Sequence, residues 1–484
     1  MEMVLGGMAR CVVVLAMLCW VLDSGCCHPR IGRAARDELC SETNDSLFLT
    51  QHVDSGNITR ARTESIVSLF TADYNIPDVH SGYITVNKSA DTNLFFMLAK
   101  GQSALDNTTS PAPLLLWLQG GPGQTSLFGQ FVEHGLLGLD GNGSFYRRNH
   151  TLWKLFDVVY LDEPVGAGYS FTRDLTDGFA KTVEDMSRDI VEFLRQFLIL
   201  FPEYHGRDFY VAGESYGSRP ALATAYSIHE EPFRVNLTLK GVINGVGFWS
   251  SIMEPLHVSS YFNALGLLDH NGYKTFSERV SNISTLASKG MHLEASMLMA
   301  QTFWSSSNKS DPTLYQELTG YEFDGNVLEP KEPPVFTRFN ELAVMPWFKK
   351  AVHVGKDRPF RKYDMYIHGN LVHDRFRDLG DMAVKVLNNY KVLVYVGQLD
   401  PTFAQDQTEV FFRNLSSWTG AQEFTSAHHK IWYINEDDTH SAGYVTRIRN
   451  FTYVKLARVG HYPAFDQPQA VTEMFFRFVN DRFV

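Results

Sequence analysis

Short apolar runs and amphipathic stretches follow one another along most of this 484-residue chain. The runs have the length and composition of strands that are buried on both faces of a sheet. In one stretch between them, Val183, Met186 and Ile190 repeat at three- and four-residue steps, which gives a helix a single apolar stripe. Strands that alternate with helices predict an α/β fold, in which a mostly parallel central sheet carries helices on both faces.

The alternation stops in the middle of the chain and then resumes. Residues 248–374 show no clear strand-helix pattern and predict a mostly helical cap insertion. We therefore expect a core built from residues 56–247 and 375–484. The predicted strands are residues 82–87 and 93–99, which pair with each other, and residues 114–118, 158–162, 209–213, 239–244, 392–397 and 453–459.

The first 26 residues have the pattern of a secretory signal peptide. Arg10 precedes the apolar residues 11–22, and Ser24 and Gly25 supply small residues for cleavage. Twelve residues are too few to span a bilayer, although an uncleaved anchor or a buried helix remains the alternative. Residues 27–55 predict a propeptide or a loose N-terminal arm, and nothing later in the chain predicts a membrane span.

Asn-X-Ser/Thr sequons are more frequent than we expect in a cytosolic protein. If the chain enters the secretory pathway, such sites imply exposed, glycosylated loops. We therefore expect a secreted or lysosomal protein, and the sequence does not separate these two destinations. The candidate acceptors are Asn44, Asn57, Asn87, Asn107, Asn142, Asn149, Asn236, Asn282, Asn308, Asn414 and Asn450.

Cysteine usage and charge exclude several classes of site. All five cysteines lie within the first forty residues, so the body of the chain predicts no disulfide, cysteine nucleophile or cysteine-based zinc site. A formal net charge of −11 argues against nucleic acid as a partner, because phosphate binding needs a basic face. The cysteines are Cys11, Cys19, Cys26, Cys27 and Cys40.

The strongest local motif is Gly-Glu-Ser-Tyr-Gly at residues 213–217, between a predicted strand and a predicted helix. In such an elbow the turn is so sharp that small residues must flank the serine, whose hydroxyl then stands above the sheet. The helix that follows points its N-terminus at the reacting centre. This context predicts Ser215 as a nucleophile.

An elbow of this kind needs an orienting acid and a base further along the chain, in that order. Asp400 follows the predicted strand 392–397, and His461 follows the predicted strand 453–459. Loops gather over the carboxyl ends of parallel strands, so both side chains are expected at the same edge as Ser215. The sequence therefore predicts a Ser215–Asp400–His461 triad.

Two further patterns bear on the chemistry of the site. After strand 114–118 the chain reads Gln-Gly-Gly-Pro-Gly, whose glycines let backbone N–H groups approach an oxyanion, although an ordinary Gly-Pro turn has the same letters. A metal site at His428, His429 and His440 is the weaker interpretation, because these residues lack a clear helical ligand spacing.

Taken together, these segments resemble the serine carboxypeptidase family, from about residue 83 to residue 480. Other matching segments are Gly397-Gln-Leu-Asp400 and Gly460-His461, the latter followed by Asp466-Gln-Pro468. The segment at residues 162–171, Asp-Glu-Pro-Val-Gly-Ala-Gly-Tyr-Ser-Phe, also fits. Gln119, where the family usually has asparagine, and Phe-Val-Glu-His-Gly at residues 131–135 are similar to the vitellogenic-like branch.

The resemblance implies an α/β-hydrolase fold and assigns roles. Ser215 would be the nucleophile, His461 the general base and then acid, and Asp400 the orienting carboxylate. Backbone N–H groups of Gly121 and Tyr216 would form the oxyanion hole. The substrate carboxylate would be held by Gln119, Gly120, Glu133 and Glu214. A carboxylate beside two glutamates requires shared protons, so such an enzyme would favour acidic pH.

Three departures bear on specificity and rate. The helix after the nucleophile begins Gly217-Ser-Arg-Pro220, where Pro220 threatens a kink or a lost backbone bond. Tyr462 and Pro463 follow the histidine where the family usually has Met-Val. Val246 stands where an acidic or amide residue is common.

The sequence thus predicts a serine-type carboxypeptidase that removes C-terminal residues from peptides or proteins through an acyl-enzyme, with no cofactor or metal. A homodimer is possible. The alternatives are an esterase or acyltransferase on the same fold, and a secreted binding protein that has lost activity.

Overall fold

The computed structural model describes residues 46–70, 74, 76–101, 111–306, 308, 310–362 and 364–483. The predicted signal peptide, all five cysteines and the sequons Asn44 and Asn107 lie outside these residues. In the described part of the chain no helix is both long enough and apolar enough to cross a membrane.

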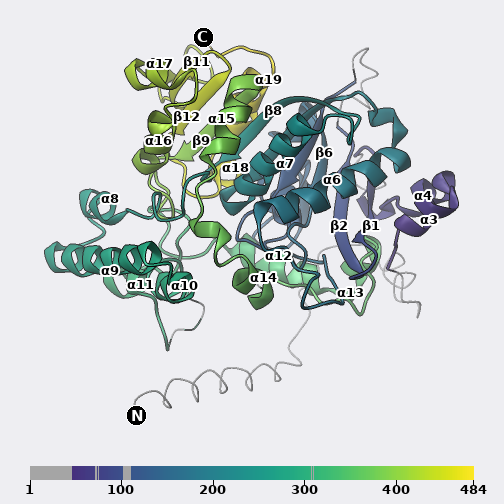
Figure 1. Cartoon of the computed structure of the whole chain (residues 1–484), viewed down its shortest axis with the longest axis horizontal. Helices are drawn as coiled ribbons and strands as arrows, with labels where there is room; N and C mark the ends of the chain where they lie inside the picture. Colours follow the sequence, from purple (N-terminus) through teal and green to yellow (C-terminus); the bar gives the residue numbers. More distant parts are fainter. Residues whose placement is uncertain are drawn as a thin grey trace.

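Ten strands of the described chain form one sheet, in the order β1-β2-β6-β3-β7-β8-β9-β12-β11-β10 (Figure 1). The strands from β6 to β12 in this order are parallel, and the outer strands at both edges are antiparallel. The strands are β1 (Val79–Asn87), β2 (Thr92–Ala99), β3 (Leu114–Leu118), β6 (Asp157–Leu161), β7 (Asp208–Glu214), β8 (Thr238–Gly245), β9 (Lys391–Gly397), β10 (Lys430–Trp432), β11 (Gly443–Ile448) and β12 (Phe451–Leu456), with a separate hairpin of β4 (Leu137–Leu139) and β5 (Phe145–Arg147).

The helices of the core lie on both sides of this sheet, which confirms the predicted fold class (Figure 1). They are α3 (Thr50–Ser55), α4 (Ile58–Glu64), α6 (Val183–Leu200), α7 (Ser218–Glu230), α15 (Gly380–Asn389), α16 (Gln405–Asn414), α17 (Ala421–Ser426), α18 (Pro463–Asp466) and α19 (Pro468–Val479). Short 3-10 turns are η2 (Ser68–Phe70), η5 (Leu152–Lys154), η6 (Pro202–Tyr204), η7 (Ser215–Gly217) and η8 (Asp374–Phe376), and η4 (Gly129–His134) is a π-helix.

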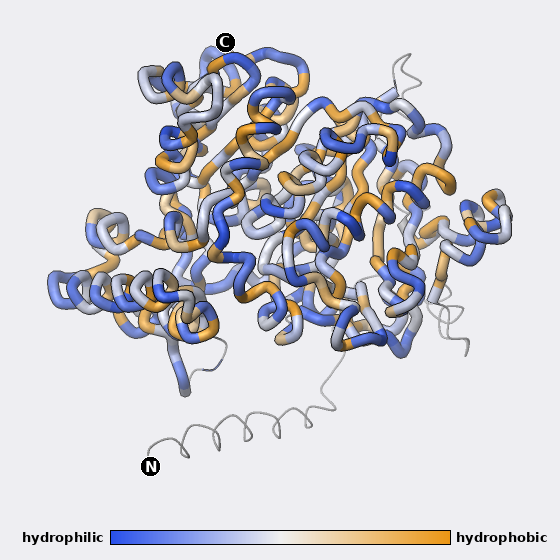
Figure 2. Tube along the Cα trace, viewed as in Figure 1, coloured by the Kyte–Doolittle hydropathy of each residue, from blue (hydrophilic) through white to orange (hydrophobic). Residues whose placement is uncertain are grey.

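Strand β3 shows why the sheet must be covered on both faces. Leu114, Leu116 and Leu118 belong to one hydrophobic cluster, and Leu115 and Trp117 belong to the other. Successive side chains of a strand point to opposite faces of the sheet. Five apolar residues in a row are therefore all buried only when both faces are covered. The hydrophobic segments accordingly gather at the centre of the molecule (Figure 2).

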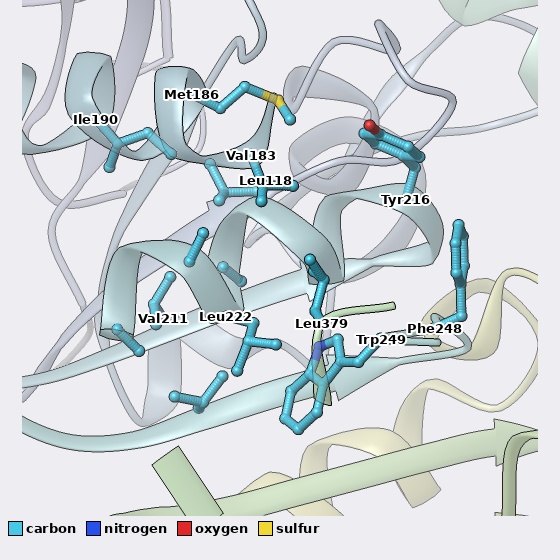
Figure 3. Close-up of a cluster of buried hydrophobic side chains, with 14 of the residues drawn as sticks. Leu118, Val183, Met186, Ile190, Val211, Tyr216, Leu222, Phe248, Trp249 and Leu379 are labelled. Carbon is cyan, nitrogen blue, oxygen red and sulfur yellow. The ribbon is translucent and has the colours of Figure 1, made fainter. Parts of the chain in front are cut away.

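Helices α6 and α7 cover one face and fix the position of the nucleophile. Val183 and Met186 of α6 pack in one cluster with Leu118 of β3 and Leu222 of α7 (Figure 3). A capping box between Thr182 and the helix starts α6. On the opposite face, Phe475 of α19 packs against Tyr395 of β9, with 6.0 Å between ring centroids.

The segment between β8 and β9 contains helices and, among its described residues, no strand. Helices α8 to α11 lie together beside the sheet, and α12 to α14 lie below it in the view of Figure 1. The boundaries at residues 248 and 374 remain a prediction. The helices are α8 (Ser259–Ala264), α9 (His270–Ser288), α10 (His292–Ala300), α11 (Leu314–Thr319), α12 (Pro334–Val344), α13 (Pro346–Ala351) and α14 (Met365–Asn370).

Three sequence expectations differ from the structure. The predicted strand 453–459 ends at Leu456, because Arg458 takes a positive φ of 59° that breaks the strand. The edge strands β10 and β11 were not predicted, since short exposed strands lack a continuous apolar run. The end of the predicted loose arm is helical and anchored, since Thr50 donates a hydrogen bond to Gln196 (2.6 Å).

Pro220 neither interrupts nor shortens α7, contrary to the expected kink. It is the third residue of the helix. The first turn of a helix has N–H groups without an intrahelical partner, so a proline there removes no hydrogen bond.

Candidate active site

The predicted triad residues follow three strands of the parallel part of the sheet. Ser215 comes directly after β7, Asp400 follows β9, and His461 follows β12. Ser215 has a positive φ of 54°, the strained geometry expected of a nucleophile elbow. Ser215 and His461 line the same cavity, whose volume is about 820 Å³. The fold therefore brings these residues to one edge of the sheet, as the sequence predicted.

Asp400 is placed to orient the histidine. Its Oδ2 lies 2.8 Å from Nδ1 of His461. Its Oδ1 accepts hydrogen bonds from the backbone N–H groups of Thr402 (2.7 Å) and Phe403 (3.2 Å). These two donors fix the orientation of the carboxyl group, which is almost fully buried. When Nδ1 of His461 donates its proton to Asp400, Nε2 is available as an acceptor, and its role as base for Ser215 remains a prediction.

The loop that carries His461 is held by the cap. The backbone N–H of His461 donates to the carbonyl of Gly325 (2.6 Å). One oxygen of Asp466 accepts from the Gly460 N–H (2.7 Å) and from the Asn326 side chain (2.9 Å). Burial lowers the pKa of His461, but the charges of Asp400, Asp324 and Glu133 outweigh it, and the net shift is upward.

Gly120 and Gly121 pack tightly against the nucleophile. A side chain at Gly120 would place its Cβ 2.6 Å from the Ser215 Cβ and 2.9 Å from the carbonyl oxygen of Glu214. Gly121 has a φ of +111°, which favours glycine. Both residues and Tyr216 line the cavity beside Ser215. Their arrangement fits the predicted oxyanion hole, and the roles of the individual N–H groups remain predictions.

The Gln119 amide joins two buried glutamates. Its Nε2 donates to Glu133 (3.1 Å) and to Glu214 (2.7 Å). Its Oε1 accepts from the indole N–H of Trp117 (2.8 Å), and this contact sets the orientation of the amide. The structure thus brings together all three of the side chains predicted for carboxylate binding.

The two glutamates hold protons at unusually high pH. Burial raises the pKa of Glu133 to about 7, and hydrogen bonds from its neighbours oppose this shift. Burial and the neighbouring Glu133 raise the pKa of Glu214 well above its usual value. At acidic pH both groups are therefore able to donate a hydrogen bond to an anionic ligand.

Sequence reasoning missed two buried arginines that support this site. Arg148 donates to the backbone carbonyls of Gln130 (3.3 Å) and Phe131 (2.7 Å) in the π-helix that carries Glu133, and to that of Gly135 (3.1 Å) directly after it. A π-helical turn is frequent at functional sites. Nothing in the sequence distinguishes this arginine from a surface one, because its carbonyl partners carry no sequence signal.

The second arginine, Arg219, packs over the ring of Tyr216, 6.0 Å from its centroid. It pairs with Asp374 (3.3 Å), and both side chains are fully buried. The Tyr216 hydroxyl donates to the same carboxylate (3.3 Å). Figure 3 shows Tyr216 beside Phe248 at the start of α7. Arg219 belongs to the departure Gly217-Ser-Arg-Pro220, which was the available sequence signal.

Tyr462, another departure, forms part of an aromatic wall of the cavity. Its ring packs against Phe128 (5.4 Å between centroids), Phe336 (4.9 Å) and Phe323 (6.3 Å). All four rings line the cavity that Ser215 lines. Val246 takes a positive φ of 40° and is buried outside this wall.

The remaining candidate residues lie away from the site. His429 packs against Tyr444, and His440 bonds to Thr439. Within the described residues, no group of three or more histidine, cysteine, aspartate or glutamate side chains is arranged to hold a metal ion. The described sequons are exposed except for Asn87, which is half-buried, and their glycosylation remains a prediction: Asn57, Asn142, Asn149, Asn236, Asn282, Asn308, Asn414 and Asn450.

Comparison with known proteins agrees with this geometry. The model of the serine carboxypeptidase family matches residues 73–481. The probable serine carboxypeptidase CPVL of Homo sapiens is 33% identical over 445 residues, which cover 90% of each chain. The vitellogenic carboxypeptidase of Aedes aegypti is 30% identical and covers 92% of each chain.

A solved structure supports the fold. The prohormone-processing carboxypeptidase Kex1 of Saccharomyces cerevisiae superposes with a TM-score of 0.69 at 20% identity, over 84% of this chain and 92% of that one. The predicted α/β-hydrolase fold and the resemblance to the vitellogenic-like branch are thereby confirmed. This chain belongs to the serine carboxypeptidase family.

Proposed function

We propose that this serine carboxypeptidase binds the free C-terminal carboxylate of a peptide at Gln119, Glu133 and Glu214 and then cleaves the last peptide bond with Ser215. The observation that carries the proposal is the Gln119 amide, which donates to both glutamates. Gln119 and Glu214 line the buried end of the cavity that also holds Ser215.

The chemistry follows from the triad. Ser215 Oγ attacks the scissile carbonyl carbon while His461 takes its proton, and the backbone N–H groups of Gly121 and Tyr216 stabilise the oxyanion. His461 then gives this proton to the leaving amine, and an acyl-enzyme remains. Water attacks the acyl-enzyme with His461 again as base, which releases the shortened peptide and restores Ser215.

The proposal gives binding and catalysis opposite pH dependences. Below the raised pKa values of Glu133 and Glu214, a shared proton joins the glutamates to the substrate carboxylate. As pH rises this proton is lost, like charges face each other, and KM increases. His461 has a raised pKa and must be neutral to act as base, so kcat falls in acid.

The test is a pH series of KM for a free-acid peptide and for the same peptide as its C-terminal amide. We expect KM of the free acid to rise by about tenfold or more between pH 5 and pH 8, which is about 1.4 kcal/mol. The amide carries no terminal charge, so its KM should change less. In Glu214→Gln the neutral side chain donates at any pH, and the rise for the free acid should flatten.

Identical pH profiles of KM for both substrates in both proteins would contradict carboxylate recognition at this site. The pH profile of kcat serves as the internal control. It depends on His461 and should keep the same shape in Glu214→Gln, so a general loss of active protein is separated from a loss of recognition.

The location of the protein is a proposal of the same kind. We infer that it travels the secretory pathway and acts in an acidic setting, either secreted or in a lysosome. The exposed sequons and the proton-holding glutamates support this inference. The buried pair of glutamates favours this proposal over an esterase or acyltransferase, whose substrates need carry no free carboxylate.

A further inference from the structure

Helix α10 is apolar on two faces. Ala295 and Met299 are buried in the packing of the cap. On another face Leu293 is 57% exposed and Met297 is 56% exposed. A surface helix of a soluble protein ordinarily carries one apolar stripe, so the second stripe requires an explanation.

The second stripe lines the cavity that contains the triad. Leu293, Ser296, Met297 and Ala300 all line it, at the three- and four-residue spacing of one helix face. Met365 of α14 lines the same cavity and is 72% exposed. We call Leu293, Met297 and Met365 the apolar rim. Figure 1 shows the two helices that carry it, α10 and α14, near each other in the lower part of the view.

Contacts between the two segments hold the rim together. His292 at the start of α10 lies 3.0 Å, nitrogen to nitrogen, from His373, which follows α14. The His292 ring also stacks on Phe376, with 4.7 Å between centroids. The exposed side chains of the rim therefore project from two segments that pack against each other.

The position of the rim assigns its ligand. The carboxylate end of the cavity is buried, since Gln119 and Glu214 are almost inaccessible. A peptide whose last residue lies there must lead the rest of its chain out through the mouth, where the lining residues are exposed. The residues that precede the cleaved bond therefore pass the rim.

The exposed side chains at the mouth of the cavity are either apolar or charged. Apart from Ala300 of α10, the other exposed lining side chains are charged, namely those of Glu322, Glu332 and Lys362. Methionine and leucine gain free energy only by burying apolar surface, and the flexible methionine side chain adapts to different partners. The rim thus favours apolar side chains without selecting one shape.

We propose that the apolar rim is an extended subsite for apolar side chains on the acyl side of the cleaved bond, which makes peptides with apolar residues before the last two positions the preferred substrates. This rests on the proposed function, because the direction of the peptide follows from carboxylate binding at Gln119.

The test uses two acetylated pentapeptides that end in the same Ala-Phe and differ only in the three residues before it, leucine in one and glutamine in the other. We measure kcat/KM for release of phenylalanine from each. In the wild type we expect the leucine peptide to be preferred by about tenfold or more. In the double variant Leu293→Ser, Met297→Ser the preference should fall to about twofold or less.

The preference is a ratio within one protein preparation, so a reduced amount of active enzyme cancels. Met291→Ser is the matched control, since Met291 precedes the same helix, is 39% exposed and does not line the cavity. It should keep the wild-type ratio. The effect of Met365→Ser should resemble that of the double variant in direction.

Two results would overturn the proposal. A wild-type ratio near one, or an unchanged ratio in the double variant, would mean that the rim contacts something other than substrate, such as another protein. If the wild type releases phenylalanine from neither peptide, the proposed function itself fails, and that outcome is distinguishable from the first two.

Discussion

At the scale of a single residue, the contacts of Asp400 place it to set the tautomer of His461 in the proposed triad. One of its oxygens is occupied by two backbone N–H donors, from Thr402 and Phe403, and only the other faces His461. The second oxygen can therefore accept a hydrogen bond from Nδ1 of His461. The tautomer of His461 depends on which atoms occupy these two oxygen positions.

Replacing Asp400 by asparagine tests this dependence. The new amide oxygen must accept from the Thr402 and Phe403 N–H groups, because an NH2 group is unable to accept. The NH2 then faces Nδ1 of His461 and forces the proton onto Nε2, which can no longer act as base for Ser215. We expect kcat to fall by a factor on the order of 10⁴ with little change in thermal stability.

Steady-state kinetics and labelling by a serine-directed fluorophosphonate measure the outcome. Asp406→Asn, at an exposed position in α16, is the control and should leave both unchanged. A loss in kcat of less than tenfold for Asp400→Asn would show that Asp400 does not orient His461.

At the scale of elements, Ser215, the proposed nucleophile, lies where the start of α7 closely approaches the end of β3. Gly217 has an ordinary helical φ of −57°, so its lack of a side chain serves no backbone requirement. A Cβ there would lie 2.3 Å from the Leu118 carbonyl oxygen and 2.7 Å from that of Gln119. Both obstacles are backbone atoms, which cannot rotate away as a side chain can.

Gly217→Ala should therefore separate α7 from β3. We expect it to lower the free energy of unfolding by about 1–3 kcal/mol or more, and to reduce kcat because Ser215 and Gln119 shift relative to each other. Urea unfolding and activity assays measure both effects. Gly369→Ala, in helix α14 with nothing within 4 Å of the new Cβ, is the control and should not destabilise. Equal stability of the two variants would refute the proposed steric role.

At the scale of the whole molecule, buried carboxyl groups make the stability of the fold depend on pH. Glu163 is 1% exposed, and neither of its oxygens has a hydrogen-bond partner among the described residues. Burial, followed by the charge of Asp189, raises its pKa well above the usual value. The folded protein keeps this proton at a pH where the unfolded chain has lost it, so stability decreases as pH rises above about 4.3.

Buried histidines have the opposite effect on stability, which they lower as the pH falls, but only at acidic pH. Burial lowers the pKa of His80 to about 4 and those of His134 and His368 to about 3. They destabilise the fold only below about pH 6.5, where the unfolded chain binds protons that they do not. Between pH 6.5 and 8 these histidines do not affect the pH dependence of stability, so only the effect of the carboxyls remains.

We therefore expect Tm to fall as pH rises from 6.5 to 8, with Glu163 contributing up to about 1.4 kcal/mol for each pH unit. Glu163→Gln keeps the shape of the side chain without a titratable proton, so its Tm should depend less on pH in this range. Thermal unfolding by circular dichroism measures the difference. The control Glu436→Gln changes an exposed side chain. If Glu163→Gln and the wild type show the same slope, Glu163 is not the linked group.

The sequence alone determined the alternation of strands and helices, the order Ser215, Asp400, His461 and the family. These are local features: apolar runs have a period, and an elbow or a glycine turn is written in neighbouring letters. The prediction that Gln119, Glu133 and Glu214 act together also came from the sequence, although only through resemblance to a family.

Only the tertiary structure determined the contacts between segments that are far apart in the sequence. Arg219 and Asp374 are 155 residues apart, and their burial as a pair follows from the packing of the cap against α7. The apolar rim likewise exists only because α10 and α14 face the cavity that Ser215 lines. Such contacts leave no periodic signal, since an arginine or a methionine has the same letter whether it faces water, a carboxylate or a substrate.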